Sequence, residues 1–230
     1  MKKRKHAADT VESNDYLLDS NIPFIVNEAY NALRTNIIFS MPGEGCKTIG
    51  VTSANRGDGK SSVALNLAIS LAQLGKKVIL LDCDLRLPTI AKKLGIKAVP
   101  GMTDMLVGEV KIEQCLRMID SFGITVLPSG NIPPDATRLL DSERFRKMIG
   151  VLRSHYDYIL LDFPPVKLVS DALIARDVTD GYVLLVHHGQ TEMNEIAEMV
   201  SKMRMAEANL LGFVYPSAPI SEKKRYGYYK

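Results

Sequence analysis

A glycine-rich segment between a strand pattern and a helix pattern narrows the possible folds of this chain more than any other feature. It reads TSANRGDGKSS over Thr52–Ser62, overlapping the β-branched run Thr48–Ser53 and the start of the helical pattern Ser61–Leu74. Glycines let such a turn direct its N–H groups inward, and the following helix adds its positive amino-terminal end. The segment therefore predicts a phosphate-binding loop, with Lys60 on the β- and γ-phosphates and Ser61 on Mg²⁺.

The predicted nucleotide contacts extend along the whole loop. Ala54 stands where the strict pattern has glycine, but its side chain is small enough to fit if its φ is negative. The alternative is an ordinary glycine-rich turn before a helix, with an incidental lysine. The residues expected to bind the nucleotide are Ala54, Asn55, Arg56, Gly57, Asp58, Gly59, Lys60, Ser61 and Ser62.

Two apolar strand patterns end in carboxylates. Asp82 and Asp84 follow Val78–Leu81, and Asp162 follows Tyr158–Leu161. Residues two apart on a strand project to the same face, and open α/β sheets bind ligands at the carboxyl ends of their strands. Each acid alone could be a strand-end or helix-capping group. Together with Ser61 beside a triphosphate, the residues Ser61, Asp82, Asp84 and Asp162 predict a magnesium site.

The remaining pattern alternates strands and helices. Strands that are apolar throughout are buried on both faces, and intervening helices make right-handed crossovers onto a parallel sheet. The fold class expected is a single three-layer α/β P-loop domain with a mostly parallel sheet flanked by helices. Strands are expected at Thr48–Ser53, Lys77–Leu81, Ile124–Leu127, Tyr158–Leu161, Gly181–Val186 and Leu211–Tyr215, and helices at Val26–Ile37, Ser61–Leu74, Ser142–Ser154 and Thr191–Glu207.

Charge separates the ends of the chain from its body. Eight of the 29 basic residues, but one of the 26 acidic residues, lie in residues 2–5 and 222–230. The body is therefore mildly acidic, which argues against a nucleic-acid-binding face. We expect a flexible basic leader over residues 1–22, the domain over 23–220, and a flexible tyrosine-rich tail over 221–230.

Cysteine usage and hydropathy indicate where the chain resides. Cys46, Cys83 and Cys115 are an odd number, far apart, and fit packing roles in a reducing compartment. No apolar run is long enough for a membrane helix, and no apolar segment follows the basic start as in a secretory signal. The sequence predicts a cytoplasmic chain that does not span a bilayer itself.

These motifs resemble those of the bacterial tyrosine kinases, in particular the cytoplasmic kinases of Gram-positive bacteria encoded with capsule or exopolysaccharide genes. Walker A resembles Ser53–Ser62, Walker A′ resembles Ile79–Asp84 and runs into Leu85–Pro88, and Walker B resembles Ile159–Asp162. Further family-like stretches lie at Glu28–Asn36, Gly101–Gly108 and Gly130–Pro134.

The resemblance implies a phosphoacceptor tail and a separate role for each residue of the catalytic site. Three of the nine tyrosines, Tyr226, Tyr228 and Tyr229, match the family's autophosphorylation cluster. The family assigns Lys60 to the phosphates of ATP, and Ser61 and Asp162 to the metal. It assigns Asp82 to accept the tyrosine proton or orient the hydroxyl, and Asp84 to support the metal shell.

The resemblance also implies partners. Family kinases form a ring through an N-terminal helix with a Glu-x-x-Arg-x-x-Arg pattern, which falls here on Glu28, Asn31 and Arg34, so the middle arginine is replaced. They act with a membrane-bound activator, through which this chain would be attached peripherally to the membrane. Protein tyrosines are the implied substrates, with transfer between subunits, and nucleic acid is not an implied partner.

Several residues depart from the family pattern and leave two other functions open. Phe163 replaces a Thr or Ser, which would put a ring where a hydroxyl lies near the metal; Asp135-Ala136 replaces Asn-Pro; and residues 214–217 replace a stretch ending in Asn-Gly that lines the adenine pocket. One alternative is a MinD/ParA-like ATPase switch, although Asn55 occupies the position of its second loop lysine. The other is a catalytically weakened nucleotide-binding adaptor of the polysaccharide machinery.

Overall fold

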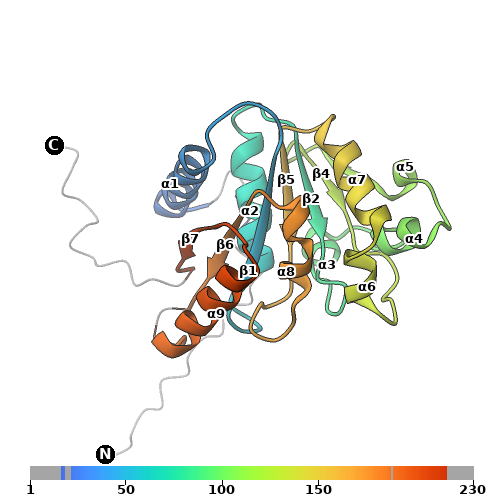
Figure 1. Cartoon of the computed structure of the whole chain (residues 1–230). Coiled ribbons are helices and arrows are strands. Elements are labelled where there is room, and N and C mark those ends of the chain that lie inside the picture. The colour runs from blue at the N-terminus through green and yellow to red at the C-terminus, as the bar shows by residue number, and fades with distance from the viewer. Residues whose placement is uncertain (1–16, 19–21, 188, 217–230) are drawn as a thin grey trace, which may run out of the picture.

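Four strands with almost wholly buried residues form the centre of a seven-stranded sheet: β2 (Val78–Asp82), β5 (Tyr158–Asp162), β1 (Lys47–Ser53) and β6 (Gly181–Leu185). The computed structural model describes residues 17, 18, 22–187 and 189–216. The strand order is β3-β4-β2-β5-β1-β6-β7, and neighbours are parallel except for the antiparallel pair β3 (Arg117–Ile119) and β4 (Ile124–Leu127). The predicted α/β class with a mostly parallel sheet is confirmed (Figure 1).

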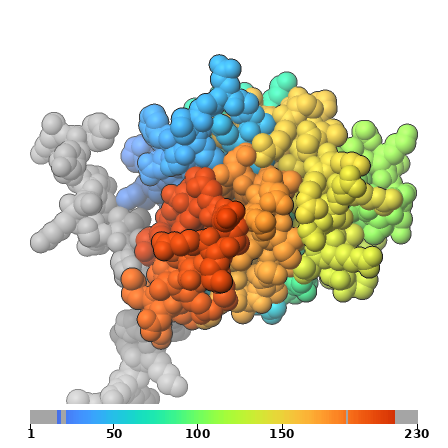
Figure 2. All heavy atoms as spheres, in the orientation of Figure 1, coloured from blue at the N-terminus to red at the C-terminus, as the bar shows by residue number. Residues whose placement is uncertain are grey.

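Helices cover both faces of this sheet. The helices are α1 (Phe24–Ser40), α2 (Lys60–Ala72), α3 (Ile90–Leu94), α4 (Met102–Val107), α5 (Ile112–Cys115), α6 (Ala136–Leu140), α7 (Glu143–Arg153), α8 (Asp171–Ile174) and α9 (Met193–Met205), with a 3₁₀ turn η1 at Ala175–Val178; the last strand is β7 (Leu210–Val214). Side chains of α1, α2 and α3 pack in one core cluster, and those of α4 to α9 pack in the other. Figure 2, in the same orientation as Figure 1, shows α7 and α9 on the face turned to the viewer.

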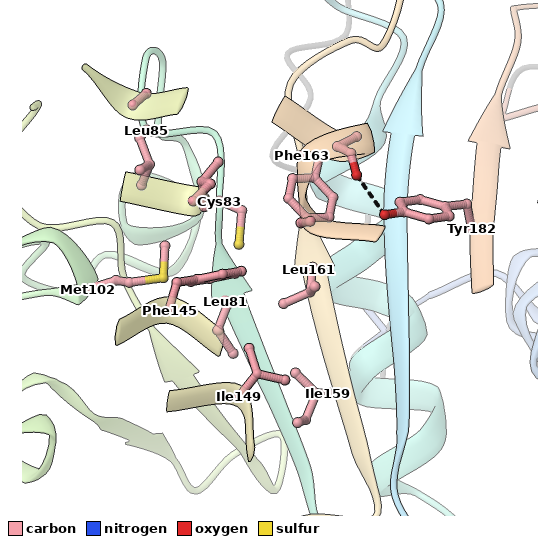
Figure 3. Packing of buried hydrophobic residues seen from close by; sticks show 14 of the residues in the cluster. Leu81, Cys83, Leu85, Met102, Phe145, Ile149, Ile159, Leu161, Phe163 and Tyr182 are labelled. Carbon is pink, nitrogen blue, oxygen red and sulfur yellow. Dashed lines mark hydrogen bonds between the residues drawn. The ribbon is translucent and has the colours of Figure 1, made fainter. Parts of the chain in front are cut away.

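Strand alternation explains these two clusters. Along β2, Ile79 and Leu81 belong to the cluster beneath α7, whereas Val78 and Leu80 belong to the cluster beneath α2. Because successive side chains of a strand point to opposite faces, a strand that is apolar at every position supplies both cores at once. The same alternation holds in β5, and Figure 3 shows Leu81 and Ile159 with the α7 residues Phe145 and Ile149 in one of the cores.

The elements missed from the sequence are short. Strand β3 has three residues, its middle residue Met118 is 75% exposed, and it pairs with β4 across a turn that ends at Gly123. Helices α3 to α6 and α8 have four to six residues each. Such segments show too little periodicity to be recognised, because one turn of helix or three residues of strand fit several patterns.

A close backbone approach explains one of the family-like stretches. A Cβ on Gly101 would lie 2.2 Å from the Gly130 backbone nitrogen, and Gly130 itself has a φ of +86°. The Asp104 carboxylate accepts hydrogen bonds from the Gly101 N–H and from the Asn131 side chain, both at 2.7 Å. Two glycines and one acid therefore join the start of α4 to the loop after β4.

One described residue of the predicted leader, Leu18, packs against the domain. The Leu18 side chain is 3% exposed, packs in the core with α2, and its N–H donates to Asn66 Oδ1 at 2.9 Å. Leu18 is therefore held in the core, and the leader bounds 1–22 and the domain bounds 23–220 stay predictions. The predicted tail over 221–230 lies outside the described residues.

The three cysteines pack in or against the core, as the composition analysis expects. Cys83 and Cys115 are buried in the core, Cys46 packs against it, and all three are free thiols. Across the described ranges, every helix is too short or too polar to cross a membrane.

Candidate active site

The loop between β1 and α2 has the backbone that phosphate binding requires. Gly57 and Gly59 have φ values of +86° and +85°, a region that glycine enters without steric cost. Gly59 is also the amino-terminal cap of α2, and no side chain caps that helix, so its first N–H groups are available to an anion. Asp58 shapes the loop from within, because its Oδ2 accepts the Asn55 N–H at 2.7 Å.

A cavity of about 280 Å³ opens over this loop. Its walls come from the loop, the segment after β2 and the segment after β5. The lining residues are Arg56, Gly57, Gly59, Lys60, Ser61, Ser62, Asp84, Arg86, Leu87, Thr89, Lys93, Pro164, Pro165, Leu168 and Val169. Ala54 has a different place: its side chain is fully buried in the core and its N–H donates to the Leu185 carbonyl at 3.1 Å.

Lys60 joins the three motifs at the floor of the cavity. Its Nζ lies 2.8 Å from Asp84 Oδ2 and 3.7 Å from Asp162 Oδ1, and it donates to Ser61 Oγ at 3.2 Å. Burial alone would lower the pKa of Lys60, but the carboxylates of Asp162 and Asp84 raise it above its ordinary value. The ammonium is therefore a fixed positive charge among oxygen atoms.

Asp82 and Asp162 end neighbouring strands in register with each other, and both are fully buried. Asp82 Oδ2 accepts the N–H groups of Thr89 and Ile90 at 3.1 and 3.0 Å. Within the described part of the chain, Asp82 Oδ1 and both Asp162 oxygens have no hydrogen-bond partner. Burial, with the neighbouring Asp162, raises the pKa of Asp82 to about 8, and burial also raises the pKa of Asp162. Such buried acceptors call for a cation.

The oxygen donors here fit Mg²⁺. Among the described residues, no three His, Cys, Asp or Glu side chains are arranged to hold a metal by themselves. Mg²⁺ needs less from the protein, since it is usually held by one or two carboxylates together with phosphate oxygens and water. Ser61 Oγ, Asp84 and the oxygens of Asp162, which lies 3.7 Å from the Lys60 ammonium, supply such donors. Of the three acids, Asp84 lines the cavity, whereas Asp82 and Asp162 are fully buried behind its lining.

Comparison with known proteins places this arrangement in a family. Residues 46–211 match the family model described as AAA domain. Tyrosine-protein kinase YwqD of Bacillus subtilis is 36% identical over 203 residues, which cover 88% of this chain and 86% of that protein. Tyrosine-protein kinase CpsD of Streptococcus agalactiae is also 36% identical, with 81% of each chain covered. The chain belongs to the bacterial tyrosine-protein kinases.

Solved structures agree with this family. The kinase domain of the Escherichia coli tyrosine kinase ETK superposes with a TM-score of 0.79 at 26% identity, covering 91% of this chain and 86% of that one. The chimerical protein CapA2B2 gives 0.78 at 30% identity, covering 82% and 83%. The septum site-determining protein MinD of Pyrococcus horikoshii, complexed with Mg-ADP, gives 0.63 at 26% identity, covering 74% and 70%. The tyrosine kinases and MinD thus share this fold.

Phe163 does not replace a hydroxyl at the metal, as its family position had suggested. Its ring is fully buried in the core, is absent from the cavity lining, and lies 6.3 Å from the Tyr182 ring, centroid to centroid (Figure 3). The Phe163 N–H donates to the Val51 carbonyl at 2.9 Å. The expectation of an aromatic ring beside the metal was wrong, because the residue after Asp162 points to the opposite side of the strand end.

The other residues that differ from the family pattern have defined contacts in the structure. Asp135 caps α6, since its Oδ1 accepts the Arg138 N–H at 3.0 Å. Pro216 lies beside the phosphate loop, because a Cβ on Gly59 would be 3.9 Å from the Pro216 Cβ. Ser217 lies outside the described residues, as do Tyr226, Tyr228 and Tyr229.

The residues of the proposed ring contact have partners within the chain. Asn31 Nδ2 donates to Glu28 Oε1 at 2.8 Å on α1. Arg34 Nη1 donates to the Ser70 carbonyl and hydroxyl on α2, at 2.8 and 3.1 Å. An interface through these three residues therefore stays a prediction, and Arg34 would need to leave Ser70 or use its other nitrogens.

Sequence reasoning missed the residues that hold the loop after β2. Thr89 and Ile90 give their N–H groups to Asp82, and Thr137 and Asp171 contact Arg86. A backbone donor has no sequence signature, and Asp171 lies 85 residues from its partner. A signal for such a pair exists only in the folded chain.

Proposed function

We propose that this chain is an ATP-dependent protein-tyrosine kinase that phosphorylates its own cluster Tyr226, Tyr228 and Tyr229, with Mg²⁺ as the metal. The single observation that supports the proposal is the ammonium of Lys60, held by Asp84 and Asp162 beside carboxylate oxygens that accept no hydrogen bond from the described residues. A triphosphate would supply negative charge for the Lys60 ammonium, and its metal would supply positive charge for the carboxylate oxygens.

The loop and Lys60 bind and orient the phosphates. The amino-terminal N–H groups of α2 face an anion, and the Lys60 ammonium adds a full charge in a site shielded from water. Ser61, Asp84 and Asp162 would hold Mg²⁺, which neutralises developing charge on the phosphate oxygens when it is bound. The protein's contribution is therefore position and electrostatics.

Asp82, or Asp84 beside it, receives the proton. The tyrosine oxygen forms a bond to the γ-phosphorus, the bond from that phosphorus to the bridging oxygen breaks, and ADP leaves with the bonding electrons. The phenolic proton passes to a carboxylate. Asp84 lines the cavity, and burial with the neighbouring Asp162 raises the pKa of Asp82, which strengthens that carboxylate as a base once it is ionised.

Regulation of polysaccharide synthesis or export is the role we propose for this activity. Support comes from the resemblance to kinases encoded with capsule genes and from 30% identity to tyrosine-protein kinase wzc of Salmonella typhi, of which this chain covers 28%. A membrane-bound activator would hold the chain at the cytoplasmic side of the membrane. Homo-oligomers through Glu28, Asn31 and Arg34 would present the tail of one subunit to another.

Mass spectrometry of the chain after incubation with Mg·ATP tests the activity. We expect phosphate on Tyr226, Tyr228 or Tyr229, and at least a roughly 1,000-fold lower rate in Lys60→Met, because the charge on the phosphates is lost. Lys77→Met is the matched control, since Lys77 lies at the opposite end of the sheet. An activator fragment is added in a parallel arm.

Other outcomes would identify the alternatives. Steady ATP hydrolysis without phosphotyrosine would overturn the proposal in favour of a MinD-like switch. Nucleotide binding without hydrolysis or transfer, with the activator fragment present, would identify an adaptor. Equal labelling of the wild type and Lys60→Met would place the chemistry elsewhere.

A further inference from the structure

Arg86 joins the loop after β2 to two helices from distant parts of the chain. Its Nε donates to Asp171 Oδ2 at 3.1 Å, and its Nη2 donates to Thr137 Oγ1 at 2.8 Å and to Asp171 Oδ1 at 3.3 Å. Asp171 is the first residue of α8 and is fully buried, whereas Thr137 lies in α6. The mechanism derived above uses neither Asp171 nor Thr137.

The three side chains form a closed network. The Thr137 hydroxyl accepts from Arg86 and donates to Asp171 Oδ1 at 2.8 Å, so both of its hydrogen-bonding functions are used. Both Asp171 oxygens accept from the same guanidinium. An arginine held by two nitrogens on one carboxylate is fixed in orientation as well as in distance, because the two planar groups must match.

This network holds the segment that carries Asp84. The segment is tied at its ends, where Asp82 accepts the N–H groups of Thr89 and Ile90. Inside it, Asp84 Oδ1 accepts the Leu87 N–H at 3.1 Å, which leaves Asp84 Oδ2 for Lys60 at 2.8 Å. Arg86 lies between Asp84 and Leu87, so an anchor on Arg86 limits how far this turn can move.

We propose that Asp171 is a positioning residue for phosphoryl transfer: with Thr137, it holds Arg86 and thereby keeps the Asp84 carboxylate at the phosphate cavity. Arg86 also lines that cavity, so the same anchor fixes a second cation at the cavity wall. The inference rests on the proposed function for its effect on rate, but the anchoring itself is independent of it.

Hydrogen exchange tests the anchor without relying on activity. The Leu87, Thr89 and Ile90 N–H groups report on the segment, because each donates to Asp84 or Asp82. In Asp171→Asn, we expect their exchange in the nucleotide-free chain to be at least tenfold faster. Thr137→Val should show a smaller increase, and Thr137→Ser, which keeps the hydroxyl, should match the wild type.

Kinetics tests the consequence for transfer. In Asp171→Asn, we expect kcat for tail phosphorylation to fall at least tenfold while the KM for Mg·ATP changes less than threefold, since the backbone N–H groups of the phosphate loop do not depend on the anchor. The control is Asp180→Asn, which alters another arginine–aspartate pair, Arg153 Nη2 to Asp180 Oδ1 at 2.8 Å, at the other end of the sheet; this pair has a single contact and is one-third exposed. The control should change neither the exchange of this segment nor kcat.

Three results would overturn the inference. The first is unchanged exchange in both Asp171→Asn and Thr137→Val. The second is faster exchange in Asp171→Asn with a kcat within twofold of the wild type. The third is an effect of Asp180→Asn on exchange and kcat that equals the effect of Asp171→Asn. A wild-type chain that transfers no phosphate would instead overturn the proposed function, and the exchange measurement would still decide whether the anchor exists. If Asp171→Asn does not fold, the pair Thr137→Val and Thr137→Ser gives the same comparison.

Discussion

Strand β5 carries an aspartate at each end, and the two have opposite surroundings. Asp157, before the strand, accepts the Lys77 N–H at 2.8 Å, and Asp180 nearby accepts from the Thr48 N–H and from Arg153. Asp162, at the carboxyl end, is fully buried and, within the described residues, neither of its oxygens accepts a hydrogen bond. The acids at the amino end thus use their oxygens in structural hydrogen bonds, whereas at the carboxyl end Asp82 Oδ1 and the Asp162 oxygens stay outside such bonds within the described residues, and we propose that they serve a ligand.

This difference shows how one sheet serves two purposes. Unpaired buried acceptors lower stability, and they persist where function requires them. Substitutions of acids at the carboxyl end of the sheet should therefore change activity, whereas substitutions of acids at the amino end should change stability alone.

The largest expected effect is on phosphate transfer. Asp84→Asn should slow tail phosphorylation by roughly 100- to 1,000-fold, because it removes a charged partner of Lys60 and of the metal. Asp157→Asn, at the opposite end of the sheet, should stay within twofold of the wild type. Labelling from radioactive ATP measures both, and an Asp84→Asn rate above one tenth of the wild type would remove Asp84 from the site.

The alkylation rate of Cys46 tests whether the thiol at the amino end of the sheet is buried. Burial raises the pKa of its thiol to about 11, from an ordinary value of 9.0. Since the thiolate is the reactive form, alkylation at pH 8 should be roughly 100-fold slower in the folded chain than after unfolding. Peptide mapping after treatment with iodoacetamide measures this ratio. Equal rates would show that the thiol at this end is exposed and ordinary.

The pH dependence of stability should change in Asp82→Asn. The folded pKa of Asp82, about 8, is above its unfolded value, so the folded chain binds more protons between about pH 4 and pH 8. Stability from this group is complete below pH 4 and is lost as the pH rises through that window.

Asparagine keeps an acceptor for the Thr89 and Ile90 N–H groups and removes the charge. We therefore expect the metal-free variant to be more stable than the wild type by about 1 to 2 kcal/mol at pH 8, with a flatter pH profile. Urea unfolding at pH 5 and pH 8 measures both. If the free energy of unfolding changes equally between pH 5 and pH 8 in the wild type and Asp82→Asn, the burial of an ionisable Asp82 would be contradicted.

Asp180→Asn should show the smallest effect. Its carboxylate accepts the Thr48 N–H at 2.7 Å and pairs with Arg153, which is one-third exposed. Because solvent screens this pair, we expect a loss of about 1 kcal/mol in the free energy of unfolding. Tail phosphorylation should be unchanged. A loss of activity without a loss of stability would reverse the distinction between the two ends.

Much of this architecture follows from the sequence because it depends on local patterns. Apolar strands predicted the order of strand and helix along the chain, and glycines at positions 57 and 59 predicted the loop. The strand-end acids predicted which residues gather near Lys60. Each of these features is encoded within about ten residues.

The remaining features depend on contacts across the chain. The anchor of Arg86 on Asp171, the placement of Asp82 behind the cavity wall and the burial of Phe163 are set by how segments pack after folding. Motif position alone put the Phe163 ring at the metal, but the strand end turns it into the core. Pattern therefore predicts which residues meet, and packing decides which of them face the cavity.

Metal-dependent nucleotide binding tests the central claim most directly. Calorimetric titration with ADP, with and without Mg²⁺, compares wild type, Asp162→Asn and Asp157→Asn. If the unpaired oxygens at the carboxyl end of β5 receive the metal, Mg²⁺ should raise ADP affinity at least tenfold in wild type and Asp157→Asn, with little effect in Asp162→Asn. The same Mg²⁺ dependence in all three proteins would contradict the account.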